Sequence, residues 1–403
     1  MKKTREKSFA KEIVRAPSQG LAVRSAAIVT RGLRDLARDS NWRVKRAFAG
    51  DSARLAISPA GQVCAVSHFA VQGTERLAVY DIESGALSLA LSVAGEKAAC
   101  PEETPAALAW SPAGRHLVAA WGGWRRELHA FDLHERRFQG VCGGFSEFPT
   151  WLAWSETGKY FAAASAGGPQ AGLRLWTSAP DVAGQMPVAG NPASELNAAA
   201  WDRSSKPAPL PEKTAAEAPD DPADAPAAPL PPGGETDEES FRGFGRLAFR
   251  PDEQQLAAVA EIEGDWADDS VVLLEMPALR KQNVFNAAGH ITDVAWTCDS
   301  RQLIVCSAGQ AFRVAPDRGE PEPLPFGAEL CACHPHLPLG LCFSSWLKNS
   351  AKGRLFLVDL GRMEVFDERP AEGVAGLRWS ADGSTAYAVT REGLAYIYEP
   401  PLL

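Results

Sequence analysis

Four residues that can bind a soft or borderline metal ion lie close together near residue 333. Cys331, Cys333, His334 and His336 fall within six residues, and cysteine sulfur and imidazole nitrogen are common ligands of zinc and copper. The same residues also fit a buried strand, because Cys331 and Cys333 alternate as apolar strand residues do. Strand geometry would splay the four side chains away from a tetrahedron. We therefore expect packing here rather than a metal site.

A second group of possible ligands is acidic. Asp265, Asp268 and Asp269 lie in the segment EGDWADDS, and carboxylates bind hard cations such as calcium. This segment lacks the alternating spacing and the glycine of a calcium loop, which favours a solvated turn. The chain also has no Gly-rich phosphate loop, no Gly-x-Ser-x-Gly elbow and no His-Glu-x-x-His pattern. We expect no catalytic residues and no cofactor.

Aromatic and arginine residues gather in segments with turn character, such as WGGWRR, GGFSEFPTW and SSWLKNS. Residues of these types dominate the binding hot spots of protein interfaces. The alternative is that each ring packs over its own surroundings. The candidate partner-binding residues are Trp121, Trp124, Arg125, Arg126, Phe145, Phe148, Trp266 and Trp346.

These segments belong to a chain with an internal repeat. Seven similar phrases begin at residues 55, 108, 152, 247, 294, 331 and 377: LAISPAGQ, LAWSPAGR, LAWSETGK, LAFRPDEQ, VAWTCDSR, CACHPHLP and LRWSADGS. Most copies read as a strand that ends in a tight turn, and most are followed by two further apolar runs. The starts lie 53, 44, 95, 47, 37 and 46 residues apart. This spacing centres on the about 40 to 45 residues of a four-stranded propeller blade.

The repeat resembles that of the WD-repeat β-propeller family over about residues 42 to 400. The phrase apolar-Ala-Trp-Ser-Pro-x-Gly carries the resemblance, and one copy opens with the family's Gly-His, at Gly289–His290. The closing Trp-Asp of the family is replaced by Tyr80–Asp81, Phe131–Asp132 and Val358–Asp359. The resemblance implies an all-β, WD-like propeller with seven blades. It also implies that the loops joining second to third and fourth to first strands open on one face, the usual binding face.

The two ends of the expected propeller, residues 42–403, each lack part of a blade. The segment WRVKRAF at residues 42–48 reads as a strand without a blade of its own. The last repeat ends at Leu394–Glu399 without a fourth strand. We therefore expect the two ends to complete one blade together, which protects sheet edges from aggregation.

The doubled repeat spacing contains residues 190–240, which are rich in proline, alanine and acidic residues. Such a composition offers little to bury, so we predict a disordered insertion. A decayed eighth repeat is the alternative, because LNAAAW at residues 196–201 imitates a first strand. No second or third strand follows it, which favours the insertion and seven blades.

The charge of the chain is unevenly distributed. Residues 1–46 hold 13 Lys and Arg against 4 Asp and Glu, whereas the rest holds 28 against 46. We predict a basic N-terminal arm over residues 1–41, in which Val29, Leu33 and Leu36 fall on one face of an amphipathic helix. The arm could bind an acidic partner, a membrane surface or the propeller itself. Because the body is acidic, we expect no nucleic-acid binding.

Location and function follow from these features as expectations. The chain has no apolar run typical of a signal peptide or a membrane span, and its eight cysteines are sparse, which indicates the cytoplasm. Propellers serve both as enzymes and as scaffolds. The first strands carry mainly Leu, Ala, Trp, Phe and Cys rather than convergent polar groups. We expect a non-catalytic protein-interaction scaffold; the alternative is a hydrolase or lactonase with its site at the central channel.

Overall fold

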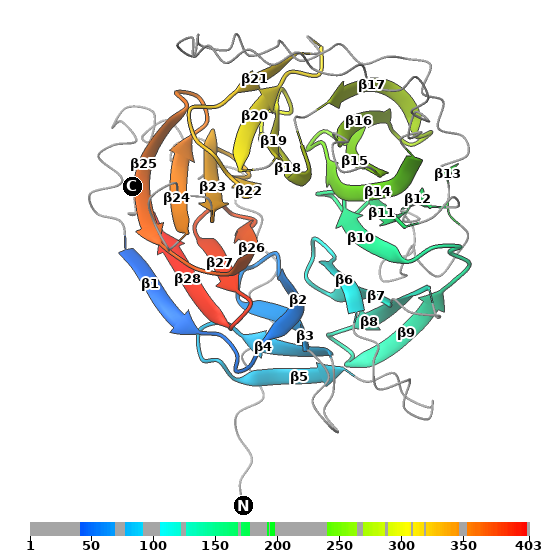
Figure 1. The fold of residues 1–403 in the computed structure, drawn as a ribbon. Helices are drawn as coiled ribbons and strands as arrows, with labels where there is room; N and C mark the ends of the chain where they lie inside the picture. The colour runs from blue at the N-terminus through cyan, green and yellow to red at the C-terminus, as the bar shows by residue number, and fades with distance from the viewer. Residues whose placement is uncertain are drawn as a thin grey trace, which may run out of the picture.

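The computed structural model is a seven-bladed β-propeller (Figure 1). Its described residues form seven antiparallel four-stranded sheets and no helix, which confirms the fold class expected from the repeat. Residues 1–40 of the predicted arm and residues 198–239 of the predicted insertion lie outside the described part. The structure describes residues 41–68, 77–91, 105–121, 126–167, 171–177, 192, 194–197, 240–263, 269–286, 289–307, 309–317, 320–345 and 353–400.

The first three blades follow one another along the chain. Blade 1 contains β2 (Ser52–Ile57), β3 (Val63–His68), β4 (Leu77–Asp81) and β5 (Leu87–Leu91). Blade 2 contains β6 (Pro105–Trp110), β7 (His116–Trp121), β8 (Glu127–Asp132) and β9 (Arg137–Cys142). Blade 3 contains β10 (Pro149–Trp154), β11 (Tyr160–Ser165), β12 (Gly172–Thr177) and β13 (Ser194–Asn197).

The remaining blades complete the ring. Blade 4 contains β14 (Ser240–Phe249), β15 (Gln255–Glu263), β16 (Ser270–Glu275) and β17 (Arg280–Asn286). Blade 5 contains β18 (Ile291–Trp296), β19 (Leu303–Ser307), β20 (Gln310–Val314) and β21 (Pro321–Pro323). Blade 6 contains β22 (Leu330–Cys333), β23 (Leu339–Ser344), β24 (Arg354–Asp359) and β25 (Glu364–Pro370). Blade 7 contains β26 (Val374–Trp379), β27 (Ala386–Thr390), β28 (Leu394–Glu399) and β1 (Asn41–Arg46).

Blade 7 joins the two ends of the described chain, as the sequence predicted. Strand β1 pairs antiparallel with β28 from Asn41 opposite Glu399 to Arg46 opposite Leu394. The Trp42 ring lies 5.0 Å from that of Tyr398, and its Nε1 donates a hydrogen bond of 2.9 Å to Asp367 of blade 6. The N-terminal strand therefore covers the outer edge of the last sheet.

Blade 3 takes its fourth strand from inside the stretch that we assigned to the insertion. Ser194–Asn197 form β13, which pairs with β12 through Leu173 opposite Leu196. Leu196 therefore closes the third blade at its rim and does not open an eighth. The polar residues around it conceal this short strand, because a rim strand needs only one apolar face.

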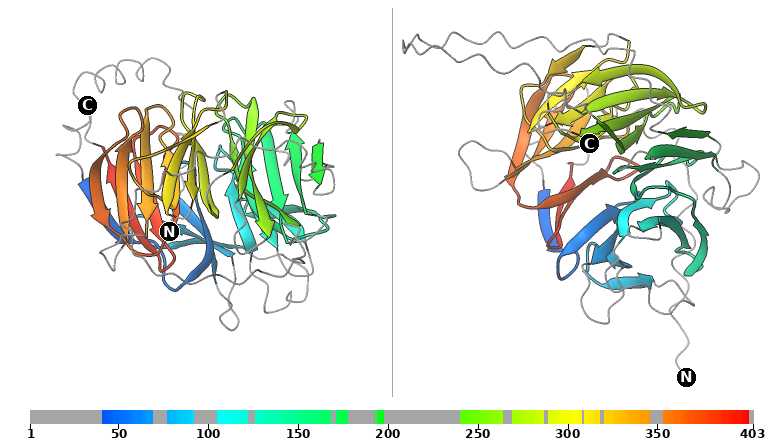
Figure 2. Two further views of the ribbon diagram at one scale, coloured as in Figure 1. Left: turned by 45° about the horizontal axis from the view of Figure 1, so that its top comes forward. Right: turned by 45° about the vertical axis from the view of Figure 1, so that its right-hand side comes forward.

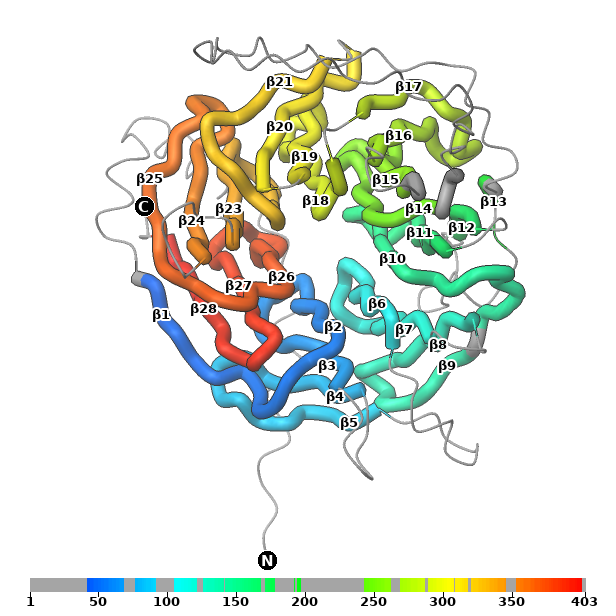
Figure 3. The backbone as a smooth tube through the Cα atoms, viewed as in Figure 1, coloured from blue at the N-terminus to red at the C-terminus, as the bar shows by residue number. Residues whose placement is uncertain are grey.

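Each blade runs outward from the axis, with its first strand innermost (Figure 3). The sheets stand side by side around the ring (Figure 2), so a second strand is covered on both faces. All six residues are buried in each of β7, β11 and β23. This burial explains runs such as YFAAAS, in which small residues let neighbouring blades approach closely.

The connections between strands define two faces of the ring. The long-loop face carries the connections from second to third and from fourth to first strands. The short-turn face carries the connections from first to second strands, where a Ser or Thr hydroxyl accepts a backbone N–H five residues ahead in five blades. These pairs are Ser58–Val63, Ser111–His116, Ser155–Tyr160, Thr297–Gln302 and Ser380–Thr385.

Among the described residues, no helix is long and apolar enough to cross a membrane.

Candidate functional site

The structure describes four of the eight predicted partner-binding residues, which lie in blade 2 and in its connection to blade 3. Trp121 ends β7, and Arg126 precedes β8. Phe145 and Phe148 lie in the connection from β9 to β10. The other four lie outside the described residues, so their placement stays a prediction: Trp124, Arg125, Trp266 and Trp346.

Trp121 and Phe145 are part of the packed interior, as the alternative to a binding role predicted. Trp121 is 9% exposed and Phe145 is 7% exposed. The Trp121 ring lies 5.5 Å from His129 of β8. Phe145 packs 6.2 Å from Trp176 and carries the Arg174 guanidinium 4.5 Å from its ring centre. Phe145 therefore packs between blades 2 and 3, whereas Trp121 packs on its own blade.

Phe148 and Arg126 form an exposed pair on the long-loop face. Phe148 is 36% exposed, and the Arg126 guanidinium lies 5.3 Å from the centre of its ring. Arg126 also donates a hydrogen bond to the carbonyl of Ser146. The described part of the chain exposes four large hydrophobic side chains, of which only Phe148 is aromatic. The pair thus presents a cation and an aromatic ring together, held by a backbone contact.

The four sequence-based metal candidates are engaged in other contacts. His334 Nδ1 accepts the backbone N–H groups of His336 and Leu337 at 2.9 and 3.0 Å, while Nε2 lies 3.0 Å from the Gly383 carbonyl. Both ring nitrogens are therefore engaged. The imidazole accepts backbone N–H groups at the turn, as a hydroxyl does in five other blades. Cys331 lies 3.5 Å, sulfur to sulfur, from Cys342 on the neighbouring strand. Among the described residues, no group of three or more His, Cys, Asp or Glu is placed to hold a metal ion.

Asp269 is buried and paired, which corrects the expectation of a solvated turn. Its carboxylate lies 2.7 Å from His290 Nδ1 and accepts the backbone N–H of Ile291 at 2.9 Å. The hydrogen bond that His290 donates to Asp269 raises the pKa of His290. Asp269 therefore fixes the connection into β18, and the Gly-His pair at 289–290 was the sequence signal for it. Asp265 and Asp268 lie outside the described residues.

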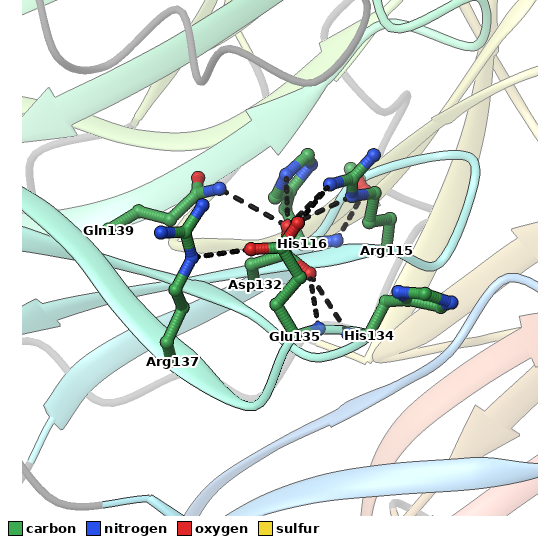
Figure 4. A network of polar contacts seen from close by, with 8 residues as sticks. Arg115, His116, Asp132, His134, Glu135, Arg137 and Gln139 are labelled. Carbon is green, nitrogen blue, oxygen red and sulfur yellow. Dashed lines mark hydrogen bonds and ion pairs between the residues drawn. The ribbon is translucent and has the colours of Figure 1, made fainter.

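A dense polar network surrounds Asp132 at the end of β8, on the short-turn face (Figure 4). The buried carboxylate accepts two hydrogen bonds from Arg115, at 2.9 and 2.8 Å, and one from Gln139 at 3.2 Å. It also accepts the backbone N–H groups of His134 and Glu135 at 3.0 Å each. Burial alone would raise the pKa of Asp132, but these bonds outweigh burial and lower it. The network caps the turn that follows β8.

Asp81 and Asp359 cap the corresponding turns of blades 1 and 6. Asp81 accepts the N–H of Ser84 at 2.7 Å, and Asp359 accepts those of Gly361 and Arg362 at 2.9 and 3.0 Å. The acidic residues that resemble the closing Asp of a WD repeat thus serve as turn caps.

The centre of the ring contains a cavity of about 720 Å³, lined by the first strands of all seven blades. Trp110, Trp296 and Trp379 lie along its wall and donate from Nε1 to a carbonyl of the preceding blade, at 2.8, 3.0 and 3.1 Å. These bonds link blades 2, 5 and 7 to their predecessors. The wall is therefore built mainly from apolar side chains and the strand backbone.

Charged residues also reach the central cavity, which the sequence analysis missed. Arg246, Asp293 and Arg378 all line it. Asp293 lies 3.6 Å from Arg246 and accepts the backbone N–H of Cys331 at 3.0 Å. Burial raises the pKa of Asp293 to about 6, against the opposing effect of Arg246. Aligning the seven repeats could have revealed these residues, because each interrupts an otherwise apolar position.

Comparisons with known proteins agree with this fold. No protein-family model matches the chain. No curated protein matches it either. Solved structures do match it over most of its length, at 13 to 16% identity, which establishes similarity of fold alone.

Three of these structures illustrate the range. One is the mitotic checkpoint complex, with a TM-score of 0.58 and 16% identity over 89% of this chain and 90% of that chain. Another is hydrazine synthase of Kuenenia stuttgartiensis, with a TM-score of 0.60 and 13% identity over 88% and 97%. The third is the β-propeller domain of Cps50 (Swd1) from Myceliophteria thermophila, with a TM-score of 0.55 and 15% identity over 89% and 99%.

Proposed function

We propose that this propeller is a non-catalytic scaffold that binds other proteins on its long-loop face, with the Phe148–Arg126 pair as one anchor. The observation that carries the proposal is an aromatic ring left exposed beneath a guanidinium, at a junction where the neighbouring aromatics are buried. Exposed aromatic and arginine side chains contribute most strongly to protein interfaces. A ring already held by its surroundings also loses little conformational freedom on binding.

The backbone around this pair is also constrained. Arg126 adopts a left-handed backbone conformation with φ of 51°, and its hydrogen bond to Ser146 ties the β7–β8 connection to the β9–β10 connection. Pro149, which follows Phe148, is buried at the start of β10. Two connections from adjacent blades therefore present the pair together. This preorganisation supports a binding role.

The matched structures are compatible with this proposal. One of them is the structure of a complex, the mitotic checkpoint complex, and another is the β-propeller domain of Cps50. We also propose a cytoplasmic location, because the chain has few cysteines for its length. The basic arm, residues 1–41, would supply a second contact to an acidic partner or a membrane surface.

The alternative function, a hydrolase or lactonase acting at the central channel, would depend on Asp293. This carboxylate is the acidic group in the cavity with a pKa raised to about 6, as a general acid or base requires. However, one oxygen faces Arg246 and the other accepts the Cys331 amide. Both oxygens are thus used in joining blades 4, 5 and 6, which favours a structural role.

The test is quantitative capture of partners from native lysate by the full chain and by two variants. Phe148→Ala is expected to reduce recovery of a specific partner and to raise the dissociation constant for that partner by about fivefold or more. Val365→Ala is the matched control, because Val365 is 37% exposed but lies on the outer strand of blade 6. Both variants should keep the wild-type melting temperature. Equal recovery of every partner by all three proteins would contradict this site.

A further inference from the structure

Arg378 occupies a position at which every other blade has alanine. It is the fifth residue of β26, and it corresponds to the alanine in the repeated strand phrase. Its counterparts are Ala56, Ala109, Ala153, Ala248, Ala295 and Ala332. In the next blade, Ile57 stands where most blades carry an aromatic residue. The Arg378 side chain therefore extends into space that a Trp fills at other blade contacts.

The Arg378 guanidinium lacks a charged partner. Its closest hydrogen-bond acceptor is the Ile57 carbonyl, at 3.5 Å from Nη1, and no carboxylate of the described residues forms an ion pair with it. Burial lowers its pKa. A guanidinium has five N–H donors, and the half-buried Arg378 side chain uses one of them in this bond. The remaining donors border the central cavity, whose wall includes Arg378.

Three more arginines lie on the side of the long-loop face. Arg54 and Arg246 occupy the position two residues earlier in their inner strands, about 6 to 7 Å higher along a strand. Arg391 lies in the turn between β27 and β28. Burial, and then the charges of Arg391 and Arg246, lower the pKa of Arg54. Arg391 and Arg246 are therefore close enough to Arg54 for their charges to repel it.

The positive charge of this cluster stands out against the rest of the propeller. Beyond residue 46, the chain has 28 Lys and Arg against 46 Asp and Glu, a net charge of −18. Within the described part of that acidic body, Arg54 donates only to the carbonyls of Ala106 and Ala53. Arg246 has one carboxylate, Asp293, at 3.6 Å. Among the described residues, Asp293 is the one acid that forms an ion pair with any of these four arginines.

We propose that the central channel is a binding site for a small oxyanion, a molecule bearing phosphate or carboxylate groups. Arg378 binds it inside the channel, with Arg54, Arg246 and Arg391 towards the long-loop face. The planar fork of a guanidinium matches the oxygens of phosphate and carboxylate groups. The cavity of about 720 Å³ has room for such a ligand. Binding supplies acceptors for the Arg378 donors that border the cavity.

The experiment measures binding to the full chain by calorimetry and by thermal shift. Pyrophosphate and citrate are the probes for phosphate and carboxylate chemistry, and sodium chloride at matched ionic strength is the reference. We expect one of the two probes to bind with a stoichiometry near one and to raise the melting temperature more than sodium chloride does. Equal effects of both probes and of sodium chloride would overturn the proposal.

Variants locate the site in the channel. Arg378→Met keeps the length of the side chain and removes its charge, and it should weaken probe binding by about 10- to 100-fold. Arg54→Met should also weaken binding, and it decides the outcome if Arg378→Met does not fold. Arg280→Met is the matched control, because Arg280 lies on the outer strand β17 and is largely exposed. Unchanged binding by Arg378→Met and Arg54→Met would refute the assignment.

Discussion

His334 shows how one residue can substitute for a repeated interaction. Five blades use a Ser or Thr hydroxyl to accept the amide at the turn after the inner strand. In blade 6 the imidazole accepts two amides from Nδ1 and contacts Gly383 of blade 7. Burial lowers the pKa of His334 to about 4. A proton on Nδ1 would break the two accepted hydrogen bonds.

This substitution predicts a component of acid sensitivity. Above pH 6.5 His334 is neutral in both the folded and the unfolded state, so the folded state keeps its full stability. Between pH 6.5 and 4 only the unfolded state takes up the proton, so stability falls by about 2 to 3 kcal/mol as the pH decreases. His334→Ser restores the residue of the other turns and should flatten this part of the profile. Urea unfolding at pH 7 and pH 4.5 measures the difference.

The absolute stability of His334→Ser at pH 7 does not decide this prediction, because the His334 ring also packs 4.7 Å from Trp379. Only the change between the two pH values matters. If wild type and variant lose equal stability from pH 7 to pH 4.5, His334 is not the titrating group.

At the scale of elements, the inner strands are joined by tryptophans that act across blade boundaries. Trp296 of β18 donates to the Ala248 carbonyl of β14 at 3.0 Å. Trp154 of β10 holds the corresponding position in blade 3, but its Nε1 is buried without a hydrogen-bond partner. A comparison of the two residues therefore separates the contribution of indole packing from that of the Nε1 hydrogen bond.

Phenylalanine is the informative replacement for both tryptophans, since Phe249 already occupies this position in blade 4. Trp296→Phe and Trp154→Phe remove the same volume, but only Trp296→Phe loses a hydrogen bond. We expect Trp296→Phe to lower the free energy of unfolding by about 1 to 2 kcal/mol more than Trp154→Phe. Chemical denaturation of the two variants measures this. Equal losses would show that the bond contributes nothing.

At the scale of the whole molecule, ring closure depends on the six residues of β1. They lie far in the sequence from β28, the strand that they cover. Strand β1 pairs with β28 along its entire length. Without β1, the apolar residues of β28 would be exposed. The contact between Trp42 and Tyr398 would also be lost. An unpaired apolar edge of this kind promotes aggregation.

Two truncations test the closure. Removal of residues 1–40 leaves β1 in place and should preserve a cooperative unfolding transition. Removal of residues 1–46 deletes β1 and should lower the melting temperature by several degrees and produce soluble aggregates. Calorimetry and size-exclusion chromatography report the two effects. Similar behaviour of both truncated proteins would mean that β1 does not stabilise the ring.

The sequence by itself determined the propeller, its seven blades and the closure of blade 7. These features are encoded locally, by strand alternation and turn residues that recur at nearly constant spacing. The short strand Ser194–Asn197 was missed, because a rim strand with one covered face carries little apolar signal. The exposed candidate Phe148 was also predictable, since an aromatic residue in a segment with turn character is visible in the sequence.

Only the tertiary structure decided which loop aromatics are free and where charge converges. Trp121 and Phe145 are buried because other residues pack against them. The local sequence around each ring does not reveal that packing. Arg54, Arg246 and Arg391 lie up to 337 residues apart in the sequence, yet the charges of Arg391 and Arg246 act on Arg54 because the closed ring brings their blades together. Burial and charge at a site depend on residues from distant segments, which the fold alone brings together.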